Sequence, residues 1–160
     1  MILLRISRPN SSVPSQYSDE GACLILSADS FLTLFLGLEL MSIPVYVLVL
    51  LGMRRAACTE AALKYLILGG AATAMLLMGV SLQFGFTGSM SLDSFGLLLD
   101  TGSPMAQAAV VLILLAFFLK AAIVPFHTWA PDAYEAATVP VTGFMSTVIK
   151  AGVLLAAVRL

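Results

Sequence analysis

Four apolar segments, each about twenty residues long, constrain the fold of this chain more than any other feature. They cover about residues 31–51, 60–84, 105–124 and 139–159. At 1.5 Å per helical residue, such a segment spans roughly 30 Å, the hydrocarbon thickness of a bilayer. The mean hydropathy is +1.02 and 11% of residues are charged, against roughly 25% in soluble domains. The sequence predicts an all-α membrane protein with four transmembrane helices.

Outside these spans, the sequence predicts little regular secondary structure. Residues 1–26 begin with a polar stretch rich in serine, proline and charge, so we expect an irregular N-terminal segment there. Residues 27–160 then form one partial transmembrane domain. Ser30, Thr59 and Ser103 precede the first three spans and can cap them. A short interfacial turn is expected over 92–99.

Charge and cysteine content exclude several classes of protein. The net charge is −1, so no nucleic acid partner is expected, and the bilayer is the expected surroundings. Cys23 and Cys58 lack the spacing of a metal site or a disulfide framework. Arg54 and Arg55 follow the first span directly, so the positive-inside rule predicts that their loop is cytoplasmic. With that orientation Arg159 lies on the outer side, in mild conflict with the rule.

The third span ends in an unusual sequence. Lys120 is followed at i+5 by Pro125, and then by the only histidine and tryptophan of the chain, His127 and Trp129. Proline inside a helix removes a donor and breaks or kinks the helix. We therefore expect the third helix to break near Pro125 and a short half-helix to follow over 126–135. A fourth span then begins near Val139.

Glu39 and Pro44 repeat the same spacing in the first span. A helical proline frees the carbonyl four residues before it, which is Leu40 for Pro44 and Ala121 for Pro125. Each freed carbonyl is next to an ionisable residue. A carbonyl of this kind can hold water inside a membrane, and water beside a titratable group can carry protons.

Three ionisable side chains, Glu39, Lys120 and Lys150, lie inside apolar spans. Each costs about 2.5–3.5 kcal/mol at a helix centre on insertion scales, so each needs a partner or a function. Ser146 and Thr147 precede Lys150 by one helical turn and give its face hydroxyl groups. A desolvated lysine can exchange between neutral and protonated forms, which favours a proton relay.

Several of these residues also have structural interpretations. Glu39 and Lys120 can form a static buried ion pair. Lys64 lies four residues after Glu60 near a helix start, where an exposed i,i+4 pair or a snorkelling lysine is expected as readily as a relay. His127 and Trp129 can anchor an interface. Asp132 and Glu135 can form a solvated rim.

The run from Lys120 to Glu135, KAAIVPFHTWAPDAYE, and the following Val139–Phe144, VPVTGF, resemble the signature of the antiporter-like subunits of respiratory complex I. The segments 36–46 and 60–69 resemble the preceding helices of the same family. Lys150 in the run STVIK is typical of the branch that includes bacterial subunit N and mitochondrial subunit two. Related L, M and sodium/proton antiporter subunits typically carry a histidine-bearing motif there.

This resemblance implies proton-transfer roles for four residues. Glu39 matches the family's glutamate, Lys120 the lysine of its broken helix, Lys150 its central lysine, and Lys64 a lysine on the helix between them. Pro44, Pro125, His127, Ser146 and Thr147 are expected to support this path as helix breaks and polar lining.

The resemblance also implies partners and a location. We expect other membrane subunits of complex I as partners, in a bacterial inner (plasma) membrane. No cofactor is expected on this chain, because NADH, FMN, iron–sulfur clusters and quinone belong to the rest of that complex. Enzymatic activity is therefore expected only as part of the NADH:quinone oxidoreductase. The alternatives are a cation/proton antiporter subunit and a non-functional structural fragment, because family members are several-fold longer.

Overall fold

The computed structural model describes residues 12–51 and 56–160, and within these ranges the regular structure is helical. The Arg54–Arg55 loop lies outside the described residues. A 3-10 turn at Leu92–Ser94 and a π-helical turn at Met145–Ile149 accompany the α-helices. The α-helices are α1 Ser12–Leu26, α2 Phe31–Leu51, α3 Ala56–Thr87, α4 Phe95–Leu99, α5 Pro104–Ala121, α6 Trp129–Ala136, α7 Val139–Phe144 and α8 Lys150–Val158.

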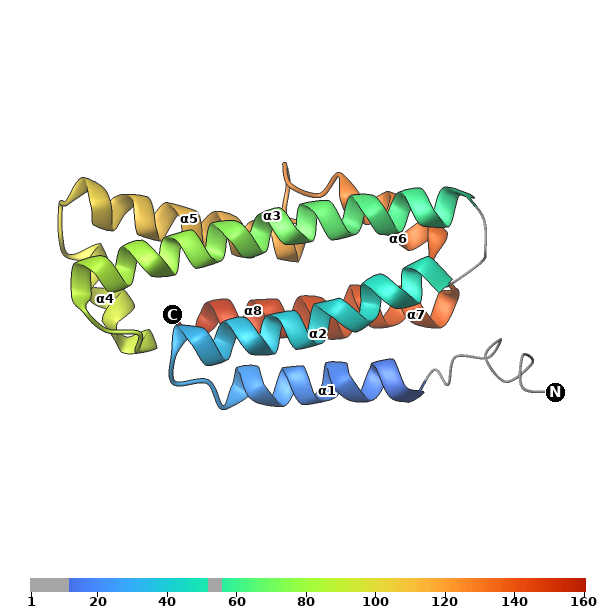
Figure 1. Ribbon diagram of the computed structural model, residues 1–160, viewed down its shortest axis with the longest axis horizontal. Helices are drawn as coiled ribbons and strands as arrows, with labels where there is room; N and C mark the ends of the chain where they lie inside the picture. Colours follow the sequence, from blue (N-terminus) through green and yellow to red (C-terminus); the bar gives the residue numbers. More distant parts are fainter. Residues whose placement is uncertain (1–11, 52–55) are drawn as a thin grey trace.

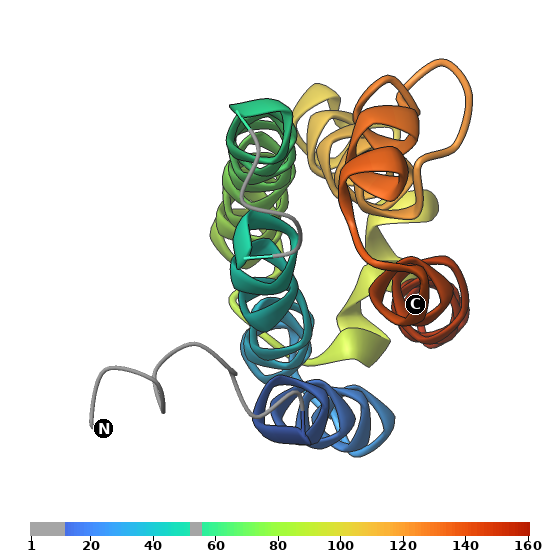
Figure 2. The same cartoon turned by 90° about the vertical axis from the view of Figure 1, so that its right-hand side faces the viewer.

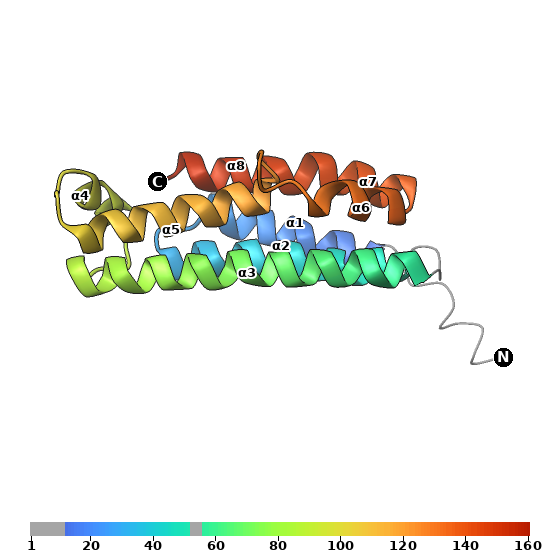
Figure 3. The same cartoon turned by 90° about the horizontal axis from the view of Figure 1, so that it is seen from above.

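The long helices lie side by side in two layers (Figures 1 and 2). Viewed along the helices in Figure 2, α1, α2 and α3 form one layer, and α5 and α6, with α7 and α8, form the other. Helix α5 ends part-way along α3, and α6 continues beside the remaining part (Figure 3). The third span is therefore broken in the middle of the bundle.

The four predicted spans are confirmed, with shifted ends. Among the described residues, four helical segments are long and apolar enough to cross a membrane: Phe31–Leu50, Thr59–Thr87, Pro104–Ala121 and Val139–Val158. Helix α3 already begins at Ala56, so the prediction that Thr59 caps it is wrong. Ser30 does cap α2, because its hydroxyl accepts a hydrogen bond from the Thr33 N–H at 3.2 Å. The turn predicted over 92–99 is present as Leu92–Ser94 and α4.

The prediction of an irregular segment over residues 1–26 is wrong for residues 12–26, which form α1, and residues 1–11 lie outside the described residues. Local composition disfavours a helix there, but packing against α2 stabilises one. Gly21 and Gly37 bring the two backbones together, and a Cβ on Gly21 would lie 2.8 Å from the Gly37 carbonyl oxygen. Ile25 is fully buried in this contact. Tertiary packing of an amphipathic face commonly decides whether a helix forms.

A second close contact joins the layers. Gly79 of α3 is buried against α5, where a Cβ would lie 2.7 Å from Ile113 and 3.0 Å from the carbonyl oxygen of Ala109. Ala106 and Ala109 on the facing side of α5 are fully buried. Small residues let membrane helices approach closely, and dispersion contacts then hold them together.

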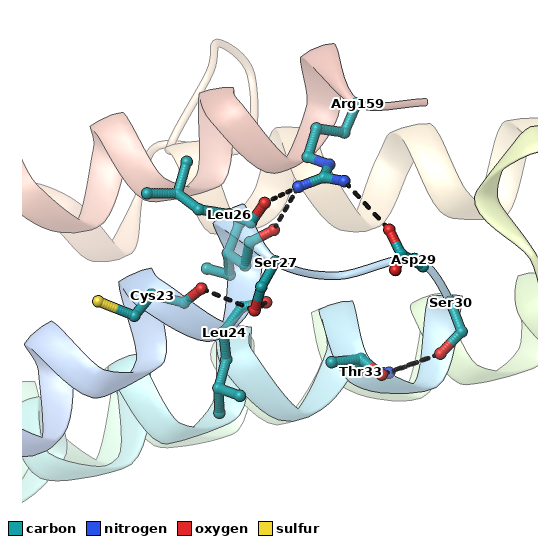
Figure 4. Close-up of polar contacts among 9 residues, drawn as sticks. Cys23, Leu24, Leu26, Ser27, Asp29, Ser30, Thr33 and Arg159 are labelled. Atoms are coloured by element: carbon teal, nitrogen blue, oxygen red, sulfur yellow. Dashed lines mark hydrogen bonds and ion pairs between the residues drawn. The ribbon is translucent and has the colours of Figure 1, made fainter.

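Arg159 at the end of α8 ties this helix to the turn between α1 and α2 (Figure 4). Its guanidinium donates to the Leu26 and Ile25 carbonyl oxygens and lies 3.7 Å from the Asp29 carboxylate. The last carbonyls of a helix have no intrahelical donor. Arg159 therefore caps α1 from another helix, which gives this arginine a structural role in addition to its charge.

Replacing Gly79 with valine should destabilise the bundle, because the added side chain meets Ile113 and backbone that cannot both move away. Overpacking of this kind typically costs about 1–3 kcal/mol. Thermal unfolding of the purified chain in detergent measures the loss. The matched control is Gly70→Ala on the same helix, where an added Cβ meets no atom within 4 Å. Equal midpoints for Gly79→Val and the parent chain would contradict the proposed packing.

Candidate functional site: a buried ion pair at a broken helix

Backbone conformation and backbone hydrogen bonds end helix α5. Ala122 follows the helix with φ of 56°, in the left-handed region, and this conformation ends an α-helix. The N–H groups of Ala122 and Ile123 turn back to the carbonyl oxygens of Phe118 and Leu119. Lys120 therefore lies in the last turn of a helix, where the partial negative charge of the carbonyl groups favours a cation.

Trp129 fixes the chain after the break. Its indole N–H donates to the carbonyl oxygen of Leu119 at 3.1 Å, and the side chain is buried. The indole stacks on Tyr65 of α3, with ring centroids 4.5 Å apart, and Tyr65 meets Tyr46 of α2 edge-on at 4.6 Å. This row of rings connects the short α6 to two long helices. The same row of rings holds the end of α5 in place, and therefore also Lys120.

Lys120 and Glu39 form an ion pair between the two layers. The ammonium Nζ lies 2.8 Å from Glu39 Oε1, and 5% and 19% of the two side chains remain exposed. The same carboxylate oxygen accepts a hydrogen bond from the Thr73 hydroxyl at 2.6 Å. The two residues that the sequence placed in separate spans thus face each other. The pair removes part of the cost of two charges in an apolar interior.

The prediction that Pro125 frees the Ala121 carbonyl is wrong. Helix α5 ends at Ala121, so Pro125 lies outside it and does not free the Ala121 carbonyl from a helical donor. The carbonyl that another segment captures is that of Leu119, through Trp129. Pro44, in contrast, does lie inside α2, which continues through it. The missing N–H there leaves the Leu40 carbonyl, next to Glu39, without its usual partner.

Lys64 forms an exposed charge cluster between α3 and α6. Its ammonium lies 2.8 Å from Glu60 on the same helix and 2.8 Å from Asp132 on α6. The expected i,i+4 pair is therefore present, together with a contact that the sequence did not predict. Nearly half of each of the Lys64 and Asp132 side chains is exposed, so the cluster is a surface contact in this chain. It fastens α6 to α3.

Lys150 begins α8, directly after the π-helical turn, and is half-buried. Its ammonium lies 5.5 Å from the centre of the Tyr134 ring, which is within cation–π range. Ser146 and Thr147 donate their hydroxyl hydrogens to the Gly143 carbonyl oxygen. They are exposed and form no hydrogen bond with Lys150 within the described part of the chain.

Two other sequence candidates lie outside this arrangement. His127 is exposed in the connection between α5 and α6, and no hydrogen bond or ion pair reaches its ring from the residues described. Glu135 is also exposed.

Sequence reasoning missed two polar contacts at the site, those of Thr73 and Tyr134. Thr73 lies in a span of small and apolar residues, where a threonine gives little signal because it can bond its own helix. Here its hydroxyl oxygen also lies 3.0 Å from the Gly69 carbonyl oxygen of its own helix, a second acceptor for the one hydroxyl hydrogen. Tyr134 looks like an interfacial residue in sequence. The chain turns back after α6, and only this turn brings Lys150 over the Tyr134 ring.

The assembled groups can hold and exchange protons. A lysine and a glutamate share one hydrogen bond at the end of a broken helix, and a second lysine follows on the neighbouring helix. Ionisable residues in this setting commonly mark ion or proton paths in membrane proteins, and broken helices commonly line such paths. The fold defines a polytopic helical membrane protein with a buried ion pair at a broken helix.

Comparison with known sequences identifies the family. The family model described as NADH:quinone oxidoreductase/Mrp antiporter, TM, matches residues 28–160. The chain belongs to this family. The identification made from the sequence motifs is confirmed.

The chain is similar to several bacterial proteins named NADH-quinone oxidoreductase subunit N. It is 44% identical to that of Pelobacter propionicus over 140 residues, which are 88% of this chain and 30% of the relative. It is 43% identical to that of Heliobacterium modesticaldum, with 88% and 29% covered. The chain thus spans about 30% of the length of the curated relatives it matches.

Solved structures show the same fold. A chain of respiratory complex I from Thermus thermophilus superimposes with a TM-score of 0.81 and 38% identity, over 90% of this chain and 32% of that one. A chain of the Mrp complex from Dietzia sp. gives 0.80 and 26% identity, over 89% and 27%. Both of these chains belong to larger complexes.

Replacing Glu39 with glutamine should destabilise the chain by about 3 kcal/mol, because it leaves the Lys120 ammonium buried without its counter-charge. Adding Lys120→Met removes that ammonium, so the double variant should recover most of the loss. Thermal or denaturant unfolding of the four proteins in detergent completes the double-mutant cycle. Strictly additive effects would show that the two side chains do not interact.

Replacing Trp129 with phenylalanine should cost about 1 kcal/mol, because it removes the hydrogen bond to Leu119 but keeps a ring against Tyr65. Trp129→Ala removes the stacked ring as well and should cost about 3–5 kcal/mol. The same unfolding measurement gives both values. Equal losses in the two variants would contradict the separate roles of the N–H group and the ring.

Proposed function

We propose that this chain is part of a proton-translocating membrane subunit of an NADH:quinone oxidoreductase, respiratory complex I. The observation that carries the proposal is the Glu39–Lys120 ion pair, which lies at the end of a broken transmembrane helix. The names of the relatives support the assignment to this complex. In this function, quinone reduction elsewhere in the complex drives proton transfer through intramembrane lysine and glutamate residues.

The geometry supports a specific division of roles. Lys120 takes up and releases a proton, and Glu39 stabilises its charged form while the two side chains are in contact. Loss of that contact favours release, because an unpaired ammonium in an apolar interior is unfavourable. Lys150 is the next carrier, and its position over the Tyr134 ring offers the cation a partner that cannot itself remove the charge.

Lys64 is the third proposed carrier. Its exposure between Glu60 and Asp132 allows it to exchange protons with water at the end of the bundle where α3 begins. His127 and the hydroxyl groups of Ser146 and Thr147 remain candidates for polar lining. Their exposed positions support contact with water or with other parts of the full subunit.

Electron transfer belongs elsewhere in this proposal. The ionisable residues of the site carry protons, and lysine and glutamate side chains do not exchange electrons at biological potentials. We therefore propose that NADH, flavin, iron–sulfur clusters and quinone bind to the rest of the complex. Other membrane subunits are the proposed partners, and the bacterial plasma membrane is the proposed location, with the Arg54–Arg55 loop on the cytoplasmic side.

A cation/proton antiporter subunit is the second candidate. It is favoured by the similarity to the Mrp complex chain, although the identity of 26% is lower than that to the complex I chain. Exchange of sodium for protons by vesicles that contain the complete subunit, without NADH, would favour this candidate.

Neutralising the lysines tests the proposed function. In the complete subunit, assembled in its complex and reconstituted into vesicles, Lys120→Met or Lys150→Met should reduce NADH-driven proton pumping at least tenfold, because each removes a carrier. Acidification of the vesicle interior, followed with a pH-sensitive dye, measures pumping.

The control for this experiment is Asp100→Asn, which neutralises an exposed carboxylate after α4 and should leave pumping unchanged. Native gel electrophoresis establishes that each variant assembles. Normal pumping by assembled Lys120→Met and Lys150→Met complexes would overturn the relay and leave the static ion pair as the role of Lys120.

A further inference from the structure

A small cavity lies beside Lys120, between α2, α3, α5 and the start of α8. Its volume is about 10 Å³, which is room for about one water molecule. The polar lining includes Ser42, Tyr46 and Lys120, and Ile149 and Val153 form part of the apolar wall. A cavity of this size can hold a water molecule when polar groups bind it, and here Ser42 and Tyr46, which carry hydroxyl groups, and Lys120, which carries an ammonium, line it.

Two hydroxyl groups of α2, those of Ser42 and Tyr46, belong to residues that line the cavity. Ser42 donates its own hydroxyl hydrogen to the Leu38 carbonyl oxygen at 2.7 Å. The phenolic oxygen of Tyr46 has lone pairs with which it can accept a hydrogen bond at the cavity.

Gly69 leaves the space that the Tyr46 hydroxyl group occupies. A Cβ at this position would lie 2.3 Å from the Tyr46 hydroxyl oxygen. Any side chain on residue 69 would therefore displace that oxygen. A Cβ on Gly70, the next residue on α3, would meet no atom within 4 Å.

Lys120 needs a second acceptor. Its ammonium has three N–H donors, and Glu39 is the acceptor that the structure shows. A donor buried without a partner is unfavourable. The cavity lies on the lysine and offers the place for a further partner.

We propose that Tyr46 is a positioning residue for Lys120, and that it acts through one water molecule bound in this cavity. The inference rests on the proposed function, in which Lys120 carries a proton. In this arrangement Lys120 donates a hydrogen bond to the water, and the water donates one to the Tyr46 oxygen. This direction stabilises the protonated lysine. When the lysine is neutral, the water turns and donates to it.

Other titratable groups on the surrounding helices also act on the charge of Lys120. Glu39 is the paired carboxylate, and the variants below leave it in place. Lys64 and Asp132 pair with each other. The titratable and charged groups on the elements around the cavity are Glu39 and Tyr46 on α2, Glu60, Lys64 and Tyr65 on α3, Asp132, Tyr134 and Glu135 on α6, and Lys150 at the start of α8.

Two variants remove the proposed contact by different means, each with a matched control. Tyr46→Phe deletes the hydroxyl group and keeps the ring against Tyr65, and Gly69→Ala displaces the hydroxyl group without altering it. Tyr17→Phe makes the same deletion at an exposed position on α1. Gly70→Ala makes the same addition where space is open. All four are made in the complete subunit and studied in the assembled complex.

Both test variants should shift the alkaline limb of the pH profile of proton pumping to lower pH by roughly 0.5–1 unit. The sign follows because loss of an acceptor disfavours the protonated lysine, which then needs a higher proton concentration. Both controls should overlay the wild-type profile. A structure of the wild-type complex that resolves waters should show one between Tyr46 and Lys120, and the Tyr46→Phe complex should lack it.

An unshifted Tyr46→Phe profile would overturn this inference, as would an empty cavity in the wild-type complex. The pumping assay of Lys120→Met distinguishes failure of the role of Tyr46 from failure of the proposed function. If that variant fails to pump while Tyr46→Phe behaves as wild type, the proposed function stands and the role of Tyr46 is wrong. If Lys120→Met pumps normally, the proposed function fails, and the role of Tyr46 fails with it.

Discussion

The ion pair between Glu39 and Lys120 is the interaction on which the arrangement of this membrane bundle depends. Each charge alone is unfavourable in an apolar interior, and neither helix can place its charge there without the other. Pairing them fixes α2 opposite the end of α5. Thr73 adds α3 to the same carboxylate. The pair is thus both a structural contact between layers and a set of groups that can gain and lose a proton.

The broken helix gives this pair its position. A continuous third span would carry Lys120 through a regular helix and leave no backbone end at that depth. Because α5 stops at Ala121, its last carbonyl groups lie inside the bundle, where Trp129 and the turning backbone satisfy them. The short α6 then fills the space beside α3 (Figure 3). It brings Tyr134 to Lys150 and Asp132 to Lys64, so one short helix contacts both lysines.

Sequence reasoning predicted the spans, the break and the ionisable residues, because hydrophobic length, proline and intramembrane charge are local signals. It did not predict how the break is made, because a left-handed Ala122 and a tryptophan ten residues after Leu119 have no sequence signature of their own. It missed α1, whose stability comes from Gly21 and Gly37 meeting across two helices. It assigned Arg159 by the charge rule alone, whereas the fold makes it a helix cap. These features depend on contacts between distant segments.

In the proposed function, the Glu39–Lys120 pair changes its charge or contact during turnover. Infrared difference spectroscopy of the assembled complex, recorded before and during quinone reduction by NADH, detects such a change. We expect a shift of carboxylate stretching bands that is missing when Glu39 is replaced by glutamine. Identical difference spectra for the wild type and the Glu39→Gln complex would show that the carboxylate does not respond, and that the pair is a static structural contact.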